Sequence, residues 1–244
     1  TTQRIFVPLQ DSGRNRINAT SKSGIGSQQY PQPWPHLLVT PSSPLRQSPL
    51  DTQSTVNLLL TRRSVLAANM RMPGPSDEDL HRILRAGIRV PDHGRIEPWR
   101  IQVLKKPGQE QLAQAISDVY RENNPAASEK QIKLEFGKPL RAPVLLVVTC
   151  HPDPDRFEKI PLIEQQRSAA AVCQNILIAA QALGYAGQWL TGWAAYDPKI
   201  RQALGHEADT DIAGFIYLGS PPEDAPKERG RPEFDAIVSH WDGE

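Results

Sequence analysis

Two apolar runs restrict the fold of this chain more than any other feature. Residues 142–150, "APVLLVVTC", and residues 211–221, "DIAGFIYLGSP", are rich in the β-branched and aromatic side chains that central strands favour. Between them, residues 161–183 predict a long and mostly buried helix. Its apolar stretch contains Gln and Asn, so we interpret it as a core helix and not as a membrane span. A fold that buries this helix against both strands is therefore expected.

Shorter elements surround these three. The segment "MPGPSDEDLHRILRAGIRV" predicts an amphipathic helix after a capping Ser76, with one apolar stripe formed by Leu80, Ile83, Leu84, Gly87 and Ile88. No strand leads directly into a glycine-rich loop and helix, so the pattern excludes a doubly wound dinucleotide-binding fold. The mixed order of elements predicts an α+β fold. The further expected helices are 53–62, 108–122, 127–137 and 197–204, and the further strands are 100–105 and a short one within 184–193.

Residues 1–50 differ in composition from the rest. They are rich in Ser, Pro, Gln and Asn and show no sustained periodicity, so they cannot bury enough apolar area to offset the entropy of ordering. We interpret them as a disordered leader or an upstream extension. Their excess of basic residues is also compatible with a transit peptide. The folded domain is expected to span residues 51–244.

Charge and cysteine content narrow the function classes. The formal net charge of +1 provides no overall field that would favour nucleic acid or an anionic membrane, so neither is expected as a partner. The two cysteines, Cys150 and Cys173, lie in apolar surroundings without metal-like spacing. That argues against a disulfide framework and for a reducing compartment. We therefore expect a cytoplasmic protein.

The segment "TRRS" at 61–64 is a candidate anion site. Arg62 and Arg63 offer forked, charged donors of the kind that bind phosphate esters, and Ser64 adds a hydroxyl. The alternative is a solvated basic helix end that complements the helix dipole. These residues alone do not decide between the two interpretations.

Other chemistry-bearing residues carry weaker signals. Asp92 and His93 are adjacent in "RVPDHGRIEPWRI", but no nucleophile motif of the form GxSxG accompanies them, so a hydrolase is disfavoured. The cluster "HPDPD" brings His151, Asp153 and Asp155 close in sequence. Without supporting ligands elsewhere it does not predict a metal site. No metal and no protein nucleophile are expected.

Several of these segments, taken in order, resemble the nitroreductase family of flavin mononucleotide (FMN) enzymes, in particular its small bacterial NAD(P)H nitroreductase branch. The resemblance rests on "LLLTRRSV", "PGPSDEDLHRILRAGIRVPDHGRIEPWRIQVL", "RAPVLLVV", "GYAGQWLTGW" and "GFIYLGSP", and it covers about residues 52–241. It implies a mixed, largely antiparallel sheet flanked by helices, in an intertwined homodimer with FMN sites at the interface.

The resemblance also implies site residues. The positions that match FMN contacts of the family are Arg62, Arg63, Ser64, Arg89, His93, Leu190, Thr191, Gly192, Arg229 and Arg231. Arg89 and His93 would reach the flavin of the partner subunit. Several family members carry Arg where this chain has Leu190, and Arg229 and Arg231 offer compensating charge. The stretch matching a nicotinamide-linked region is Ala180, Gln181, Ala182, Leu183, Gly184 and Tyr185.

The implied activity is a ping-pong transfer of electrons from NADH or NADPH, through FMN, to a nitroaromatic, quinone or related small-molecule acceptor. The flavin would carry the redox chemistry, and the protein would orient it. Two alternatives stay open. One is a non-catalytic flavin-binding or flavin-storage protein, and the other is different flavin chemistry on the same fold, which the short connection at 105–140 disfavours because it leaves little room for a lid.

Overall fold

The computed structural model describes residues 52–207, 209–224 and 226–243, so the expectation for residues 1–50 lies outside the described part. The strands are β1 (Trp99–Leu104), β2 (Val144–Cys150), β3 (Ala186–Leu190) and β4 (Asp211–Gly219). The α-helices are α1 (Thr52–Thr61), α2 (Asp77–Gly87), α3 (Lys106–Asn123), α4 (Glu129–Gly137), α5 (Leu162–Ala182), α6 (Trp193–Tyr196) and α7 (Pro198–Ala203). Four short 3₁₀ turns are η1 (Ala67–Asn69), η2 (His93–Arg95), η3 (Pro154–Arg156) and η4 (Phe234–Ala236).

The strands form one sheet in the order β1-β2-β4-β3, and every pairing among the described strands is antiparallel. The two apolar runs are the two central strands, as predicted, with Val147 opposite Phe215. The α+β class is likewise confirmed. β3 lies at one edge of the sheet, and this position matters because both parts of the candidate site are built against it.

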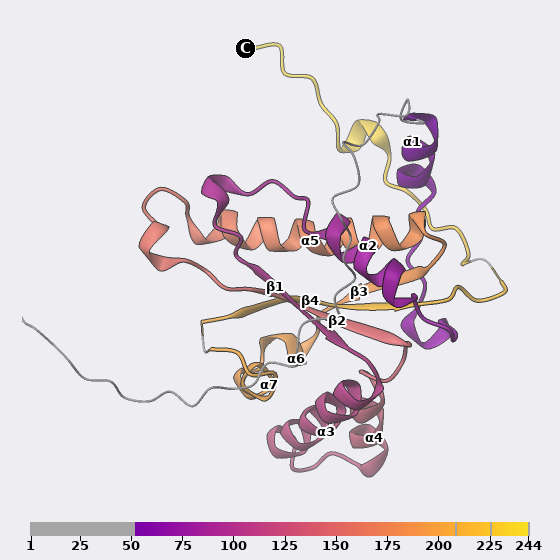
Figure 1. Ribbon diagram of the computed structural model, residues 1–244, viewed down its shortest axis with the longest axis vertical. Coiled ribbons are helices and arrows are strands. Elements are labelled where there is room, and N and C mark those ends of the chain that lie inside the picture. Colours follow the sequence, from indigo (N-terminus) through magenta and orange to yellow (C-terminus); the bar gives the residue numbers. More distant parts are fainter. Residues whose placement is uncertain (1–51, 208, 225, 244) are drawn as a thin grey trace, which may run out of the picture. The chain divides into compact units, whose positions relative to one another are not determined.

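The sheet is covered on both faces (Figure 1). Along β2, Leu145 and Val147 face a core completed by α3, α6 and α7, whereas Leu146 and Val148 face a core completed by α2 and α5. This alternation follows from the two-residue period of a strand. All seven residues of β2 are buried, which explains its continuous apolar sequence.

Local sequence explains where several helices begin. The hydroxyl of Ser76 accepts a hydrogen bond from the Asp79 N–H at the start of α2, as predicted. Ser128 and Gln131 form a reciprocal capping box at the start of α4. The long apolar helix α5 packs against α2 and the sheet. Within the described residues, no helix has both the length and the apolar character needed to cross a bilayer.

Candidate functional site

The arginine segment leaves α1 and runs along the free edge of β3. The Arg62 N–H donates the last hydrogen bond of α1, to the Leu58 carbonyl at 2.9 Å. Three residues later the Val65 N–H bonds to the Gly187 carbonyl at 3.2 Å, and the Ala67 N–H bonds to Gln188 Oε1 at 2.7 Å. The "RRS" residues are therefore held next to β3 by the backbone that follows them.

The segment that follows the arginines continues past the first residue of β3. Arg71 pairs in an antiparallel bridge with Ser220, which follows the β4 residue opposite Ala186, the first residue of β3. The chain from Val65 to Arg71 therefore runs against the direction of β3. Arg62, Arg63 and Ser64 immediately precede this segment, at the edge of the sheet that β3 forms.

A second chain segment joins the arginines from the far end of the sequence. Arg63, whose side chain is 14% exposed, donates to the Lys227 carbonyl and pairs with Glu228 at 3.2 Å. Arg231 pairs with the other oxygen of the same carboxylate at 3.2 Å. The Arg63 hydrogen bond, followed by one from the Arg229 N–H, lowers the pKa of Glu228. The structure thus brings three predicted residues together around one anion.

Arg62 and Ser64 complete this arginine cluster, which we define as residues 62–64 and 228–231. Arg62 Nη1 lies 3.4 Å from the Ser64 hydroxyl oxygen, and both residues keep exposed surface. Because the ion pairs of the cluster are solvent-accessible, they contribute little to folding stability, typically about 0–1 kcal/mol each. Their geometry is better suited to holding an anion such as a phosphate group.

The Leu190–Gly192 turn has a backbone that requires glycine. Gly192 adopts φ 95° and ψ −178° and precedes α6 directly. That region of backbone space is accessible almost only to glycine. Leu190 packs partly against the core, while Thr191 and Gly192 are exposed. The turn therefore presents bare backbone at the end of β3.

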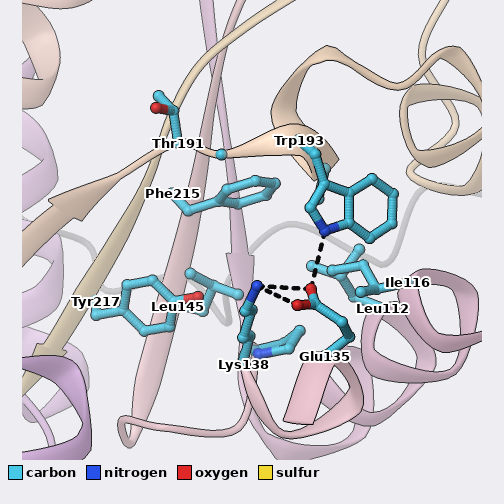
Figure 2. Close-up of a pocket in the computed structure, with 12 residues that line it drawn as sticks. Leu112, Ile116, Glu135, Lys138, Leu145, Thr191, Trp193, Phe215 and Tyr217 are labelled. Carbon is cyan, nitrogen blue, oxygen red and sulfur yellow. Dashed lines mark hydrogen bonds and ion pairs between the residues drawn. The ribbon is translucent and has the colours of Figure 1, made fainter. Parts of the chain in front are cut away.

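A small cavity of about 40 Å³ lies behind this turn, between it, α3, α4 and the central strands. Figure 2 shows the apolar side chains of Leu112, Ile116, Leu145 and Phe215 around it. The polar side of the cavity is formed by Glu135 and Lys138, whose ion pair measures 2.5 Å. Sequence reasoning missed Glu135, although its spacing of three from the buried Ile132 puts an acid on the apolar face of α4.

Arg89 and His93 lie in a different region. The Arg89 carbonyl accepts from Asn175 Nδ2 at 2.9 Å, and His93 Nδ1 pairs with Glu164 at 2.8 Å. These two contacts hold the connection from α2 to β1 alongside α5. From Arg89 to His93 the connection runs toward the first turn of α5. In Figure 1, α1 lies near the other end of α5. Among the described residues, no hydrogen bond or ion pair joins Arg89 or His93 to the arginine cluster.

The stretch predicted to contact a nicotinamide lies at the end of α5 and is largely engaged within the chain. Ala180 has no exposed surface, and Gln181 and Leu183 are half-buried. The Tyr185 hydroxyl donates to Asp79 at 2.8 Å, which raises the pKa of Tyr185 and lowers that of Asp79. Ala182 and Gly184 are exposed. The role of this stretch stays a prediction.

The residues of "HPDPD" are occupied locally. His151 Nε2 bonds to the Thr149 hydroxyl at 3.0 Å, and Asp153 accepts from the Asp155 N–H at 3.2 Å. Across residues 52–207, 209–224 and 226–243, no group of three or more His, Cys, Asp or Glu is placed to hold a metal ion. Burial raises the pKa of Cys150 to about 11 and that of Cys173 to about 12, so neither thiol is a ready nucleophile.

Comparison with known proteins gives one consistent family. The model of the nitroreductase family matches residues 59–220, which is more than half of the chain. A relative from Escherichia coli named "Putative NAD(P)H nitroreductase YdjA" is 33% identical over 188 residues, covering 76% of this chain and 98% of the relative. The region matched by the family model contains residues 62–64 of the arginine cluster, the turn and the connection alongside α5, and it ends before residues 228–231.

Solved structures show the same fold. A nitroreductase-like protein from Bacillus cereus superposes with a TM-score of 0.64 at 22% identity, covering 78% of this chain and 96% of the other. A nitroreductase with bound FMN from Bacteroides fragilis superposes with a TM-score of 0.59 at 21% identity, covering 77% and 98%. At these identities the likeness is one of fold.

Proposed function

Since this chain belongs to the nitroreductase family, we propose that it is an FMN-dependent oxidoreductase. It takes electrons from NADH or NADPH and passes them to nitroaromatic, quinone or related acceptors in a ping-pong sequence. The observation that carries the proposal is an arginine cluster that gathers around one carboxylate beside the edge strand β3, which itself leads into a glycine turn. The printed name of the Escherichia coli relative and the FMN bound to the Bacteroides fragilis structure support it.

The residues present fit a phosphorylated flavin. Arg63 and Arg231 already hold the two oxygens of the Glu228 carboxylate, which stands in for a phosphate in charge and in acceptor atoms. At the turn, no atom of the rest of the chain lies within 4 Å of where a Cβ of Gly192 would be, which leaves room for a flat ring to approach closely. Residues Arg62, Arg63, Ser64, Arg229 and Arg231 would hold the phosphate, and Leu190, Thr191 and Gly192 would contact the ring.

The division of labour follows from this placement. When bound, FMN would supply the two-electron chemistry between the nicotinamide and the acceptor. The arginine cluster anchors the cofactor by charge, and the turn orients its ring. None of the described nucleophilic side chains is needed for this scheme, in keeping with the raised pKa values of both cysteine thiols.

We propose that two subunits complete each site. Large apolar side chains are exposed on α1, at the start of α5 and along the C-terminal segment, and they include Leu59, Leu60, Leu162, Ile163, Phe234, Ile237 and Trp241. Exposed apolar surface of this extent is typical of an interface. The separation of Arg89 and His93 from the arginine cluster within one chain supports their contribution to the site of the partner.

One spectroscopic experiment tests the redox activity. The purified protein is loaded with FMN, and its visible spectrum is recorded before and after anaerobic addition of NADH or NADPH. Loss of the oxidised-flavin absorbance within one turnover, followed by its return when a nitroaromatic or quinone is added, is expected. Stable FMN binding without any bleaching would instead support a flavin-storage protein, an alternative that the internal engagement of Ala180 and Tyr185 favours.

Complementation tests the shared site. Arg62→Ala and His93→Ala homodimers each have two damaged sites. A mixed dimer has one intact site, built from the Arg62 of one chain and the His93 of the other. Recovery of about half of the wild-type activity in isolated mixed dimers is expected from a symmetric interface. No recovery would mean that His93 does not serve the partner's flavin.

We also propose a reducing, cytoplasmic location, which the two free and buried cysteines support.

A further inference from the structure

Glu135 is a charged side chain in a place that disfavours charge. The residue is 7% exposed and faces the core from α4. Carboxylates are rarely buried to this extent unless they are paired and hydrogen-bonded. Glu135 meets that condition through Lys138, whose ammonium group lies 2.5 and 2.6 Å from its two oxygens. This ion pair within one helix balances the charge of Glu135, but it does not by itself explain why the side chain faces the core.

A second hydrogen-bond partner, Trp193, explains why the Glu135 side chain is buried. The indole Nε1–H of Trp193 donates to Glu135 Oε2 at 2.9 Å, as Figure 2 shows. Trp193 is the first residue of α6 and is bonded directly to Gly192. The ring of Tyr120 packs against the indole at a centroid distance of 5.7 Å. The indole is thus held from α4 by a hydrogen bond and from α3 by a ring contact.

The cavity behind the turn makes this anchor important. A turn on a close-packed core is held by the side chains beneath it. Here a space of about 40 Å³ lies beneath Thr191 and Gly192, so part of that support is missing. Gly192 also lacks a side chain that would restrict its backbone. The hydrogen bond between Trp193 and Glu135 holds the side chain of the residue next to the turn, in addition to the backbone hydrogen bonds of α6.

We propose that Glu135 is a positioning residue for the flavin ring. Through Trp193 it fixes the backbone of Thr191 and Gly192 at the place where the ring would lie, and Lys138 balances its charge. This inference rests on the proposed function, because it takes the turn to face the flavin. It assigns to α4, a helix outside the arginine cluster, a role in the redox site.

Three substitutions separate the hydrogen bond from the charge. Glu135→Leu removes the acceptor, and Trp193→Phe removes the donor but keeps an aromatic ring. Glu135→Gln keeps an oxygen that can accept from the indole, and Lys138, at 37% exposure, can turn to solvent. We expect the first two variants to raise the dissociation constants of FMN and riboflavin by the same factor, about three- to tenfold, as for the loss of one buried hydrogen bond. Glu135→Gln should stay within about twofold of wild type.

The flavin itself provides the readout that a merely structural role would not change. The visible spectrum of bound FMN should shift in Glu135→Leu and Trp193→Phe. Its two-electron midpoint potential should also move, and a threefold change in the preference for reduced over oxidised flavin is about 14 mV. The double variant should be no worse than either single variant, because both remove the same bond.

Gln109→Ala is the matched control. Gln109 is 3% exposed and donates to the carbonyls of Pro139 and Ala142, so it supports the same α3–α4 region without touching the turn. We expect this variant to melt at a lower temperature with an unchanged flavin spectrum and potential. An equal shift of the flavin in Gln109→Ala, or an unchanged flavin in Glu135→Leu, would overturn the positioning role.

A measurement without flavin separates this inference from the proposed function. The indole N–H resonance of Trp193, assigned from its absence in Trp193→Phe, should move in Glu135→Leu and stay in place in Gln109→Ala. If the wild-type protein binds no flavin, the proposed function fails. If the Trp193 resonance does not move in Glu135→Leu, the positioning role of Glu135 is contradicted and the proposed function is not affected.

Discussion

The two ends of the candidate flavin site are held in opposite ways. In the arginine cluster of residues 62–64 and 228–231, the ion pairs meet at the exposed carboxylate of Glu228. The Leu190–Gly192 turn is instead anchored from below by the buried Glu135, through Trp193. Exposed charge gives affinity that depends on salt, whereas buried hydrogen bonding gives geometry. We infer that the first end sets how tightly a phosphorylated flavin binds and the second sets how its ring is oriented.

The largest effect is expected from a substitution in the arginine cluster. Arg62→Ala should raise the dissociation constant of FMN about ten- to a hundredfold, because a charged hydrogen bond contributes roughly 1.5–3 kcal/mol. Riboflavin, which lacks the phosphate, should be affected little, and fluorescence titration of both ligands measures the difference. Arg71→Ala is the control, because Arg71 lies on the same segment but pairs with Glu223. Equal weakening of FMN and riboflavin would move Arg62 out of the phosphate site.

The second-largest effect is expected from a substitution in the Leu190–Gly192 turn. Gly192→Ala forces a side chain into backbone space that costs roughly 1–3 kcal/mol of unfolding free energy. Gly205→Ala is matched, because Gly205 also has a positive φ, at 80°, and open space where a Cβ would lie. Urea unfolding should show a loss of stability for both variants. Only Gly192→Ala should also weaken riboflavin, and a normal riboflavin affinity in that variant would contradict the assignment of the turn.

The salt dependence of FMN and riboflavin binding tests the difference between the arginine cluster and the turn without any mutation. Raising the ionic strength from 0.01 M to 1 M shortens the Debye length from about 30 Å to about 3 Å. The dissociation constant of FMN should therefore rise several-fold with salt, while that of riboflavin stays nearly constant. A parallel salt dependence for both ligands would mean that the arginine cluster does not act on the phosphate.

The smallest expected effect concerns pH and lies away from both ends. His151 and His206 pack edge to face at 5.3 Å, and burial lowers the pKa of both imidazoles below the usual value of about 6.5. The unfolded chain therefore binds protons more readily, so stability is complete above the unfolded pKa and falls as the pH drops through the lowered folded values. Thermal melting between neutral and mildly acidic pH measures this slope. His206→Gln should reduce it, and an unchanged slope would exclude His206 as a source.

Much of the fold could be predicted because its signals are local. The β-branched runs of β2 and β4, the capped stripe of α2 and the long apolar α5 all follow from side-chain periodicity and composition, and the structure confirms them. The short helix α6 was missed. The turn and short strand predicted within residues 184–193 include only its first residue, Trp193, and no element is predicted for residues 194–196, since one helical turn leaves no periodicity to detect.

The residues of the candidate site also divide into those that local sequence indicates and those that only the fold brings together. The sequence by itself indicates Arg62, Arg63 and Ser64 as a candidate anion site, and the family resemblance adds Leu190–Gly192 to it as a prediction. Only the tertiary structure decided that Arg63 meets Glu228, and that Trp193 rests on Glu135. Those contacts join residues 165 and 58 positions apart along the chain. Both contacts are settled by how the helices and terminal segments pack around the whole sheet, in which β3 is the edge strand, and not by any local propensity.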